Sequence, residues 1–367
     1  MAMLPGMSAF SFPSGPMVTD IWPMARVMAG MSAVPVGHAI DLAFFFPDAD
    51  RERHDALMAE TRRHLGGCLT GIESALRIAL SDQPQIAAVL AQQASAISWP
   101  TICAQPTLLG PALLAHMQMR AGVTLMLRQF GQPDGQFDEA EADALLCTGD
   151  PAINETLAAL AVAEGRWLAI GAEDEAMAPD LPVEHYAELL WTAAACMAAV
   201  VQRAGTNDAE AILPLFEKAG RTLLAAHDEA KGPIAIAARL VRQLGERADA
   251  ADLLGAALGQ RRFLLFAALA ARRLRMDCAH VADIMVLGPV SELAALCRAL
   301  GGSDVDYRLL LLALRPVRPS LSDAAIIGES DRYQALTEAQ ADAAVSALRV
   351  PAALRAKFDH LSRVALR

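Results

Sequence analysis

The stretch GQRRFLLFAALAARRLRM, residues 259–276, decides the fold class of this chain. Its apolar residues recur at the three- and four-residue intervals that place side chains on one face of an α-helix: Phe263, Phe266, Ala267, Ala270 and Leu274. The leucines and alanines between them widen the apolar face beyond half of the circumference, which is typical of a helix packed on two sides. The stretch therefore predicts an inner helix of a helical protein.

The same helical period recurs along the remaining chain, and strand-like alternation is almost absent. Of the 367 residues, 54% are apolar and only 5% aromatic, a composition filled by Ala and Leu and unlike that of β-rich proteins. We therefore predict an all-α protein. The helices are expected near residues 50–66, 68–80, 84–97, 107–129, 138–147, 151–169, 183–203, 208–227, 233–245, 248–258, 260–275, 278–286, 289–300, 304–314, 332–346 and 351–365.

Three parts are expected along the chain. Residues 1–35 hold seven of the fifteen methionines and offer no amphipathic face, so they predict a loosely ordered extension. A helical bundle is expected over 36–204 and a HEAT-like helical-repeat array over 205–367. Expected start signals are Asp150-Pro151 and Ser81 to Pro84, and expected stops are Gly131, Gly205, Gly245 and Gly301-Gly302.

The repeat prediction rests on two similar segments. DLLGAALGQRRFLLFAAL (252–269) and DIMVLGPVSELAALCRAL (283–300) align at an offset of 31 residues. Each reads as a short helix, a tight turn and a longer helix. Such a unit has to stack on its neighbours to bury its apolar face, which is the logic of a solenoid. Chance similarity of two Ala/Leu-rich helices is the alternative.

The C-terminal half resembles a family of alphaproteobacterial proteins. The likeness lies in DLPVEHYAELLWTAAACMAAVV (180–201), FLLFAALAARRLRMDCAHVADIMV (263–286) and AALCRALGGSDVDYRLLLLAL (294–314). In its Leu/Ala patterning this half is similar to the uncharacterised family called domain of unknown function 2336. The resemblance implies an all-helical, repeat-like cytoplasmic protein and supplies no catalytic residues.

Neither a membrane span nor a disulfide framework is expected. Residues 83–119 contain no charged side chain, but four prolines interrupt them before the roughly 20 residues that a bilayer requires. The six cysteines contain no CxxC pair and lie in apolar helical contexts, where free cysteine behaves as a small hydrophobic residue. A reducing cytoplasm is the expected location, and no cofactor is expected.

One motif suggests metal chemistry. The sequence AAHDEAKG around His227 and Asp228 resembles the HDxxK signature of metal-dependent phosphohydrolases of the HD superfamily. That chemistry needs a further histidine upstream and an aspartate downstream, and only His185 lies near enough upstream. The alternative interpretation is structural: His227 ends a helix and Asp228 begins a connecting loop. No phosphate-binding loop, GxSxG or HExxH motif occurs.

Charge is distributed unevenly along a chain whose net charge is −11. Residues 134–188 carry fourteen acidic side chains against one arginine, whereas residues 239–275 carry eight arginines against three acids. Such asymmetry predicts a partner, which can be another part of the same chain or another molecule. Nucleic acid is disfavoured because aromatic stacking residues are few and the overall charge is negative.

We therefore predict a non-catalytic interaction or regulatory scaffold that binds an acidic protein partner, because arginine pairs with carboxylates through two parallel hydrogen bonds. The alternatives are an HD-type phosphohydrolase using His227 and Asp228, and an intramolecular contact between residues 134–188 and the arginines. Solvated helix ends without a binding role are a third possibility. The predicted binding residues flank the inner helix: Arg261, Arg262, Arg272, Arg273 and Arg275.

Overall fold

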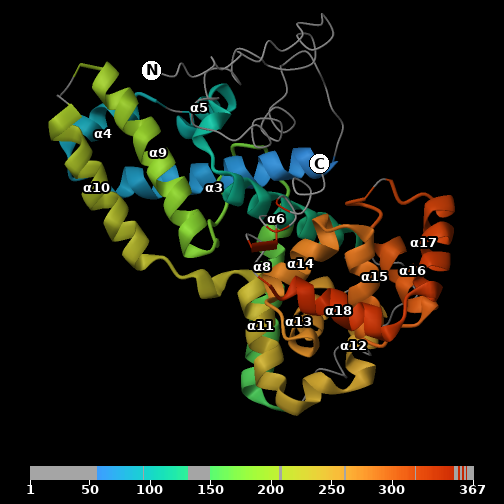
Figure 1. Cartoon of the computed structure of the whole chain (residues 1–367). Coiled ribbons are helices and arrows are strands. Elements are labelled where there is room, and N and C mark those ends of the chain that lie inside the picture. The colour runs from blue at the N-terminus through green and yellow to red at the C-terminus, as the bar shows by residue number, and fades with distance from the viewer. Residues whose placement is uncertain are drawn as a thin grey trace, which may run out of the picture.

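The protein is helical throughout the part of the chain that the structure describes. This computed structural model describes residues 56–350 except 94, 131–148, 206–208, 260–261 and 319, and also Leu354, Arg355, Phe358 and Leu361. These residues form fifteen α-helices, three short 3-10 helices and no strand (Figure 1). The all-α prediction is confirmed. The predicted extension at 1–35 and the helix at 138–147 lie outside the described residues, as does most of the helix at 351–365.

A first hydrophobic core lies among helices from two separate stretches of the chain. Its buried side chains include Leu69, Ile102 and Leu189, none of which is exposed to solvent. The contributing helices are α3 (Ala56–Ala79), α4 (Pro84–Ala91), α5 (Ser98–Ala104), the first half of α6 (Pro111–Phe130), α9 (Val183–Arg203) and α10 (Ala209–Ala226). The short 3-10 helix η1 (Pro106–Leu108) connects α5 to α6.

The second core is larger and contains the inner helix. It is formed by the second half of α6 with α8 (Pro151–Leu168), α11 (Pro233–Leu244), α12 (Ala251–Gly259), α13 (Phe263–Leu274), α14 (Cys278–Leu287), α15 (Val290–Ala299), α16 (Asp304–Ala313), α17 (Asp323–Ala335) and α18 (Glu338–Leu348). The 3-10 helices η2 (Glu229–Lys231) and η3 (Gly245–Asp249) precede α11 and α12.

Helix α6 joins the two cores. Leu113 and Met117 belong to the first core, whereas Val123 and Met126 belong to the second. Helices that are consecutive in the sequence also lie in different cores. Helix α8 packs on α11 in the second core, whereas α9 and α10, which follow α8, pack in the first. The predicted domain boundary between residues 204 and 205 stays a prediction. The two hydrophobic cores do not divide the chain at this point.

Several predicted helix boundaries coincide with local signals. Asp150 accepts a hydrogen bond from the backbone N–H of Ala152 and so caps α8, whose first residue is Pro151. Gly205 and Gly301 adopt positive φ angles of 73° and 80° directly after α9 and α15, a conformation that ends helices and favours glycine. These start and stop predictions are confirmed.

Some boundary predictions are wrong, among them the helix predicted at 84–97, which ends at Ala91. The helices predicted at 50–66 and 68–80 are one continuous helix over the described residues, α3, which passes through Gly66 and Gly67. The glycines are required by packing, because a Cβ at Gly66 would overlap the carbonyl oxygen of Glu173. The helix predicted at 332–346 is instead the end of α17 and the start of α18, separated at Leu336 because Thr337 forms a capping box with Gln340.

The two repeat-like segments each contain two helices, but the predicted longer second helix is present only in the first segment, because both helices of the second have ten residues. Each consists of a short helix, a turn and a second helix: α12 with α13, and α14 with α15. Ten of the twelve residues of α13 are buried, and the helix packs against α11, α12 and α14 (Figure 1). The prediction of an inner helix is confirmed. It begins at Phe263 rather than at residue 260.

Candidate functional site

The arginines predicted to form a binding surface do not share one. Arg262 is the N-cap of α13, and its backbone N–H donates to the carbonyl of Ala257, closing the turn from α12. Arg262 therefore directly precedes the helix and does not lie within its first turn. Arg261 lies outside the described residues. The other three arginines lie at the opposite end of α13 and have different environments.

Arg272, Arg273 and Arg275 each take a separate role. Arg272 forms a bidentate pair with Asp249 of η3, with Nε–Oδ1 and Nη2–Oδ2 distances of 3.0 and 2.9 Å. This pairing lowers the pKa of Asp249, helped by the charges of Arg272 and Arg273. Arg275 is exposed and ends the helix in a left-handed conformation, with φ 51°. Arg273 alone reaches into a pocket.

The acidic segment pairs mainly with arginines outside residues 239–275. Asp180 contacts Arg120 Nη1 at 2.9 Å and Arg166 Nη2 at 3.5 Å, and Glu173 accepts two hydrogen bonds from Arg62. The charge of Arg262 acts on Glu164 of the acidic segment, where it opposes the rise that burial causes in the pKa of this carboxyl.

His227 and Asp228 are occupied by structural interactions. His227 Nε2 lies 2.7 Å from the carbonyl oxygen of Leu181, and its ring stacks on Tyr186 with centroids 3.9 Å apart. Asp228 accepts from the backbone N–H of Ala230 and so begins η2. Within the described part of the chain, no three His, Cys, Asp or Glu side chains are grouped to hold a metal ion. The geometry thus favours the structural interpretation.

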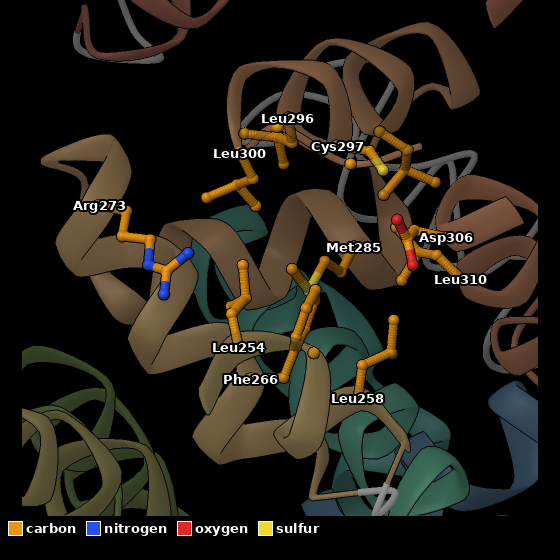
Figure 2. Close-up of a pocket in the computed structure, with 14 residues that line it drawn as sticks. Leu254, Leu258, Phe266, Arg273, Met285, Leu296, Cys297, Leu300, Asp306 and Leu310 are labelled. Carbon is orange, nitrogen blue, oxygen red and sulfur yellow. The ribbon is translucent and has the colours of Figure 1, made fainter. Parts of the chain in front are cut away.

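A pocket of about 200 Å³ opens inside the second core (Figure 2). Five helices line it, from α12 to α16, together with the turn at Gly301 and Gly302. Its lining is dominated by buried apolar side chains, which leave few polar atoms to hold water. The lining residues are Leu254, Gly255, Leu258, Phe266, Arg273, Met285, Leu293, Leu296, Cys297, Leu300, Gly301, Gly302, Asp306 and Leu310.

The polar groups of the pocket lie at opposite sides. Figure 2 shows the Arg273 guanidinium extending toward Leu254 and Leu300, and Asp306 across the pocket beside Leu310. The Asp306 carboxylate accepts hydrogen bonds from the backbone and hydroxyl of Ser303, which completes the capping box of α16. The pocket therefore has a positive group, Arg273, on one side and a negative group, Asp306, on the other.

The pocket thiol is unsuited to nucleophilic chemistry. Burial raises the pKa of Cys297 to about 11, so the thiol stays protonated at neutral pH. The hydroxyl of Tyr333 lies 3.6 Å from the sulfur and donates to the closer carbonyl oxygen of Gly302, at 2.5 Å. Among the residues that line the pocket there is no histidine. The arrangement can bind a molecule but provides no activated nucleophile.

Sequence reasoning placed Arg273 at a functional surface but missed the pocket. The lining side chains are core leucines whose spacing is that of any buried helix face. The signals that do relate to the pocket are the repeated helix–turn–helix units and Gly301-Gly302, because the cavity lies where these units meet. A void between packed helices depends on side-chain volumes across five elements, which periodicity does not encode.

Comparison with known proteins adds no relative. The chain matches no protein-family model, no curated protein and no solved structure. The resemblance to domain of unknown function 2336 therefore stays a prediction. Among the described residues, no helix is both long enough and apolar enough to cross a bilayer.

Proposed function

We propose that this protein is a non-catalytic, regulatory binding protein that takes up one small apolar molecule between α12 and α16. The observation that carries the proposal is the 200 Å³ pocket with its largely apolar lining. An apolar cavity of roughly 150 Å³ is enough to stay dry and bind benzene. The pocket therefore has room for a ligand somewhat larger than benzene.

The surroundings of the pocket support binding rather than catalysis. Met285 and Leu296 are each 1% exposed, so the walls are held by the core and the shape is preformed. The protonated thiol of Cys297 is a poor nucleophile. HEAT-like stacking of α12–α13 on α14–α15 is part of the proposal, because α13 packs on α14. A ligand between the two units would then act on their packing.

The predicted acidic protein partner has less support. Arg272 is paired with Asp249, Arg273 lines the pocket, and Arg262 lies at the far end of α13. Of the five predicted binding residues, Arg275 alone is both described and fully at the surface. The partner therefore stays a prediction, while the pocket supplies the leading function.

A thermal-shift titration with small apolar probes tests the proposal. Toluene and indole should raise the melting temperature with increasing concentration, because a ligand that binds only the native state stabilises it. Leu300→Phe should reduce the shift by narrowing the pocket. Leu309→Phe is the matched control, since Leu309 is 51% exposed on α16 and does not line the pocket.

The proposal fails if none of the probes shifts the melting temperature. It also fails if Leu300→Phe and Leu309→Phe respond to the probes as the unchanged protein does, because the probes would then bind elsewhere.

A further inference from the structure

The further inference concerns the chemical class of the ligand and rests on the proposed function. Among the described residues that line the pocket, Arg273 is the only basic one. It projects from the last turn of α13, and its Nη2 donates to the carbonyl oxygen of Ala250, just before α12. This hydrogen bond fixes one edge of the planar guanidinium, so the orientation of the remaining donors is set before a ligand arrives.

One of those remaining donors is buried without a partner. The Nε–H of Arg273 has no hydrogen-bond acceptor among the described residues, although the atom is shielded from solvent. A buried donor left unsatisfied destabilises the native state by about 1–3 kcal/mol, and more when the group is charged. No water-sized molecule reaches Nε, so a ligand in the pocket would instead accept from Nη1, which is open to solvent and has no hydrogen-bond partner among the described residues.

The charge of the pocket selects a monoanion. A single guanidinium pairs well with a planar carboxylate through charge-assisted hydrogen bonds. A phosphate monoester carries about −1.5 to −2 charges and would keep uncompensated charge among the leucines. Asp306, across the pocket, would repel any anionic group placed beside it. The carboxylate end of a ligand is thus directed to Arg273 and its apolar body to Phe266 and Met285.

Arg272 shows why its neighbour is the ligand-binding group. Both arginines lie in the last turn of α13, but both edges of the Arg272 fork are engaged by Asp249. Arg272 does not line the pocket. Arg272 therefore holds η3 in place, whereas Arg273 has a hydrogen-bond donor left for a ligand.

We propose that the pocket between α12 and α16 binds a small apolar monocarboxylate, aromatic or short-chain aliphatic, whose carboxylate accepts hydrogen bonds from Arg273. The pocket volume is about 200 Å³, whereas a cavity of roughly 150 Å³ holds benzene. The difference is about the volume that a carboxylate group needs. Benzoate and hexanoate are therefore suitable probes.

The test compares isosteric probes by isothermal titration calorimetry on the full chain. Benzoate and benzamide have nearly the same shape, and so do hexanoate and hexanamide, so each pair differs mainly in charge. Each carboxylate should bind the unchanged protein about tenfold to a hundredfold more tightly than its amide, because hydrogen bonds to charged groups are the stronger ones. Arg273→Met should abolish this preference, whereas Arg272→Met, the matched control, should retain it.

The outcomes separate this inference from the proposed function. If acid and amide bind the unchanged protein equally, the carboxylate inference is overturned and the binding function stands. If neither member of either pair binds and the neutral probes also fail, the proposed function is overturned as well. Unchanged benzoate affinity in a folded Arg273→Met protein overturns the role of Arg273. Because the acid–amide comparison uses the unchanged protein, it decides the inference even if a variant does not fold.

Discussion

Nε of Arg120 donates a hydrogen bond to Nδ1 of His64 over 2.8 Å, and neither residue is exposed to solvent. Because Nδ1 accepts, the proton of the neutral ring is on Nε2, which lies 3.0 Å from Glu60 Oε1. Arg120 also pairs with Asp180 and lies over the Trp167 ring, 4.6 Å from its centroid. This buried network joins α3 and α6 to the segment between α8 and α9.

We expect Arg120→Met to destabilise the protein strongly. It would leave the carboxylate of Asp180, which is 5% exposed, without its closest cation and with only the part-exposed Arg166 at 3.5 Å, so the loss of stability should approach that of a broken buried ion pair, about 3–5 kcal/mol. Urea denaturation should show a lower midpoint at unchanged slope.

Arg128→Met is the comparison for this prediction. Arg128 is 34% exposed, and its partner Glu60 keeps Arg63, so the loss of stability should be clearly smaller. Equal losses in the two variants would contradict the central role of Arg120.

Acid should destabilise the protein through buried imidazoles. The rings of His116 and His185 have centroids 4.7 Å apart and are tilted by 37° to each other. Burial lowers the pKa of His116 to about 3, with further lowering by His185 and Arg120. The folded pKa lies below the ordinary histidine value of 6.5. Stability is therefore fully present above pH 6.5 and falls as the pH decreases toward 3.

His116→Phe keeps an aromatic ring against His185 but removes this titration. As the pH is lowered from 7 to 3, the melting temperature should fall less steeply in the variant than in the unchanged protein. This pH window follows from the lowered pKa of His116. The slope should not vanish, because burial also lowers the pKa of His64, to about 3. An identical pH profile in the variant would show that His116 does not titrate in this way.

The inner helix was predictable from sequence because its determinants are local. Phe263 to Leu274 carry an apolar pattern that a helix must bury, and Asp150-Pro151 and Gly301 mark helix ends by their own backbone preferences. The pairing of Arg120 with His64 was not predictable. The two residues are 56 positions apart on different helices, so no local spacing in the sequence relates them. The same limit applies to the pocket, which arises from five helices.

A third prediction concerns the carboxyl of Glu164, which is half-buried on α8. Burial raises its pKa to about 7, against the opposing charge of Arg262. A raised folded pKa means that stability is fully present below the ordinary value of 4.5 and is lost as the pH rises through 7. Glu164→Gln should therefore raise the melting temperature at pH 8 and have little effect at pH 4.

The control for this prediction is Glu155→Gln, on the exposed face of the same helix, which should change the melting temperature little because the side chain makes no buried contact. A Glu164→Gln protein that is less stable than the unchanged protein at pH 8 would indicate that pairing with Arg262 outweighs burial.

The last prediction concerns the packing of α6 against α14, where α6 passes from the first core to the second. Gly122 lies against α14, and a Cβ at this position would overlap Cγ1 of Val286. Gly122→Ala should lower the free energy of unfolding by about 1–3 kcal/mol, because overpacking displaces side chains and backbone. Gly165→Ala in α8 is the control, since no atom lies within 4 Å of its added Cβ. It should instead stabilise the protein by up to about 1 kcal/mol through helix propensity.

Adding Val286→Ala to Gly122→Ala should recover part of the loss, so a double-mutant cycle in urea gives a coupling energy. Strict additivity would mean that α6 and α14 are not in contact at Gly122.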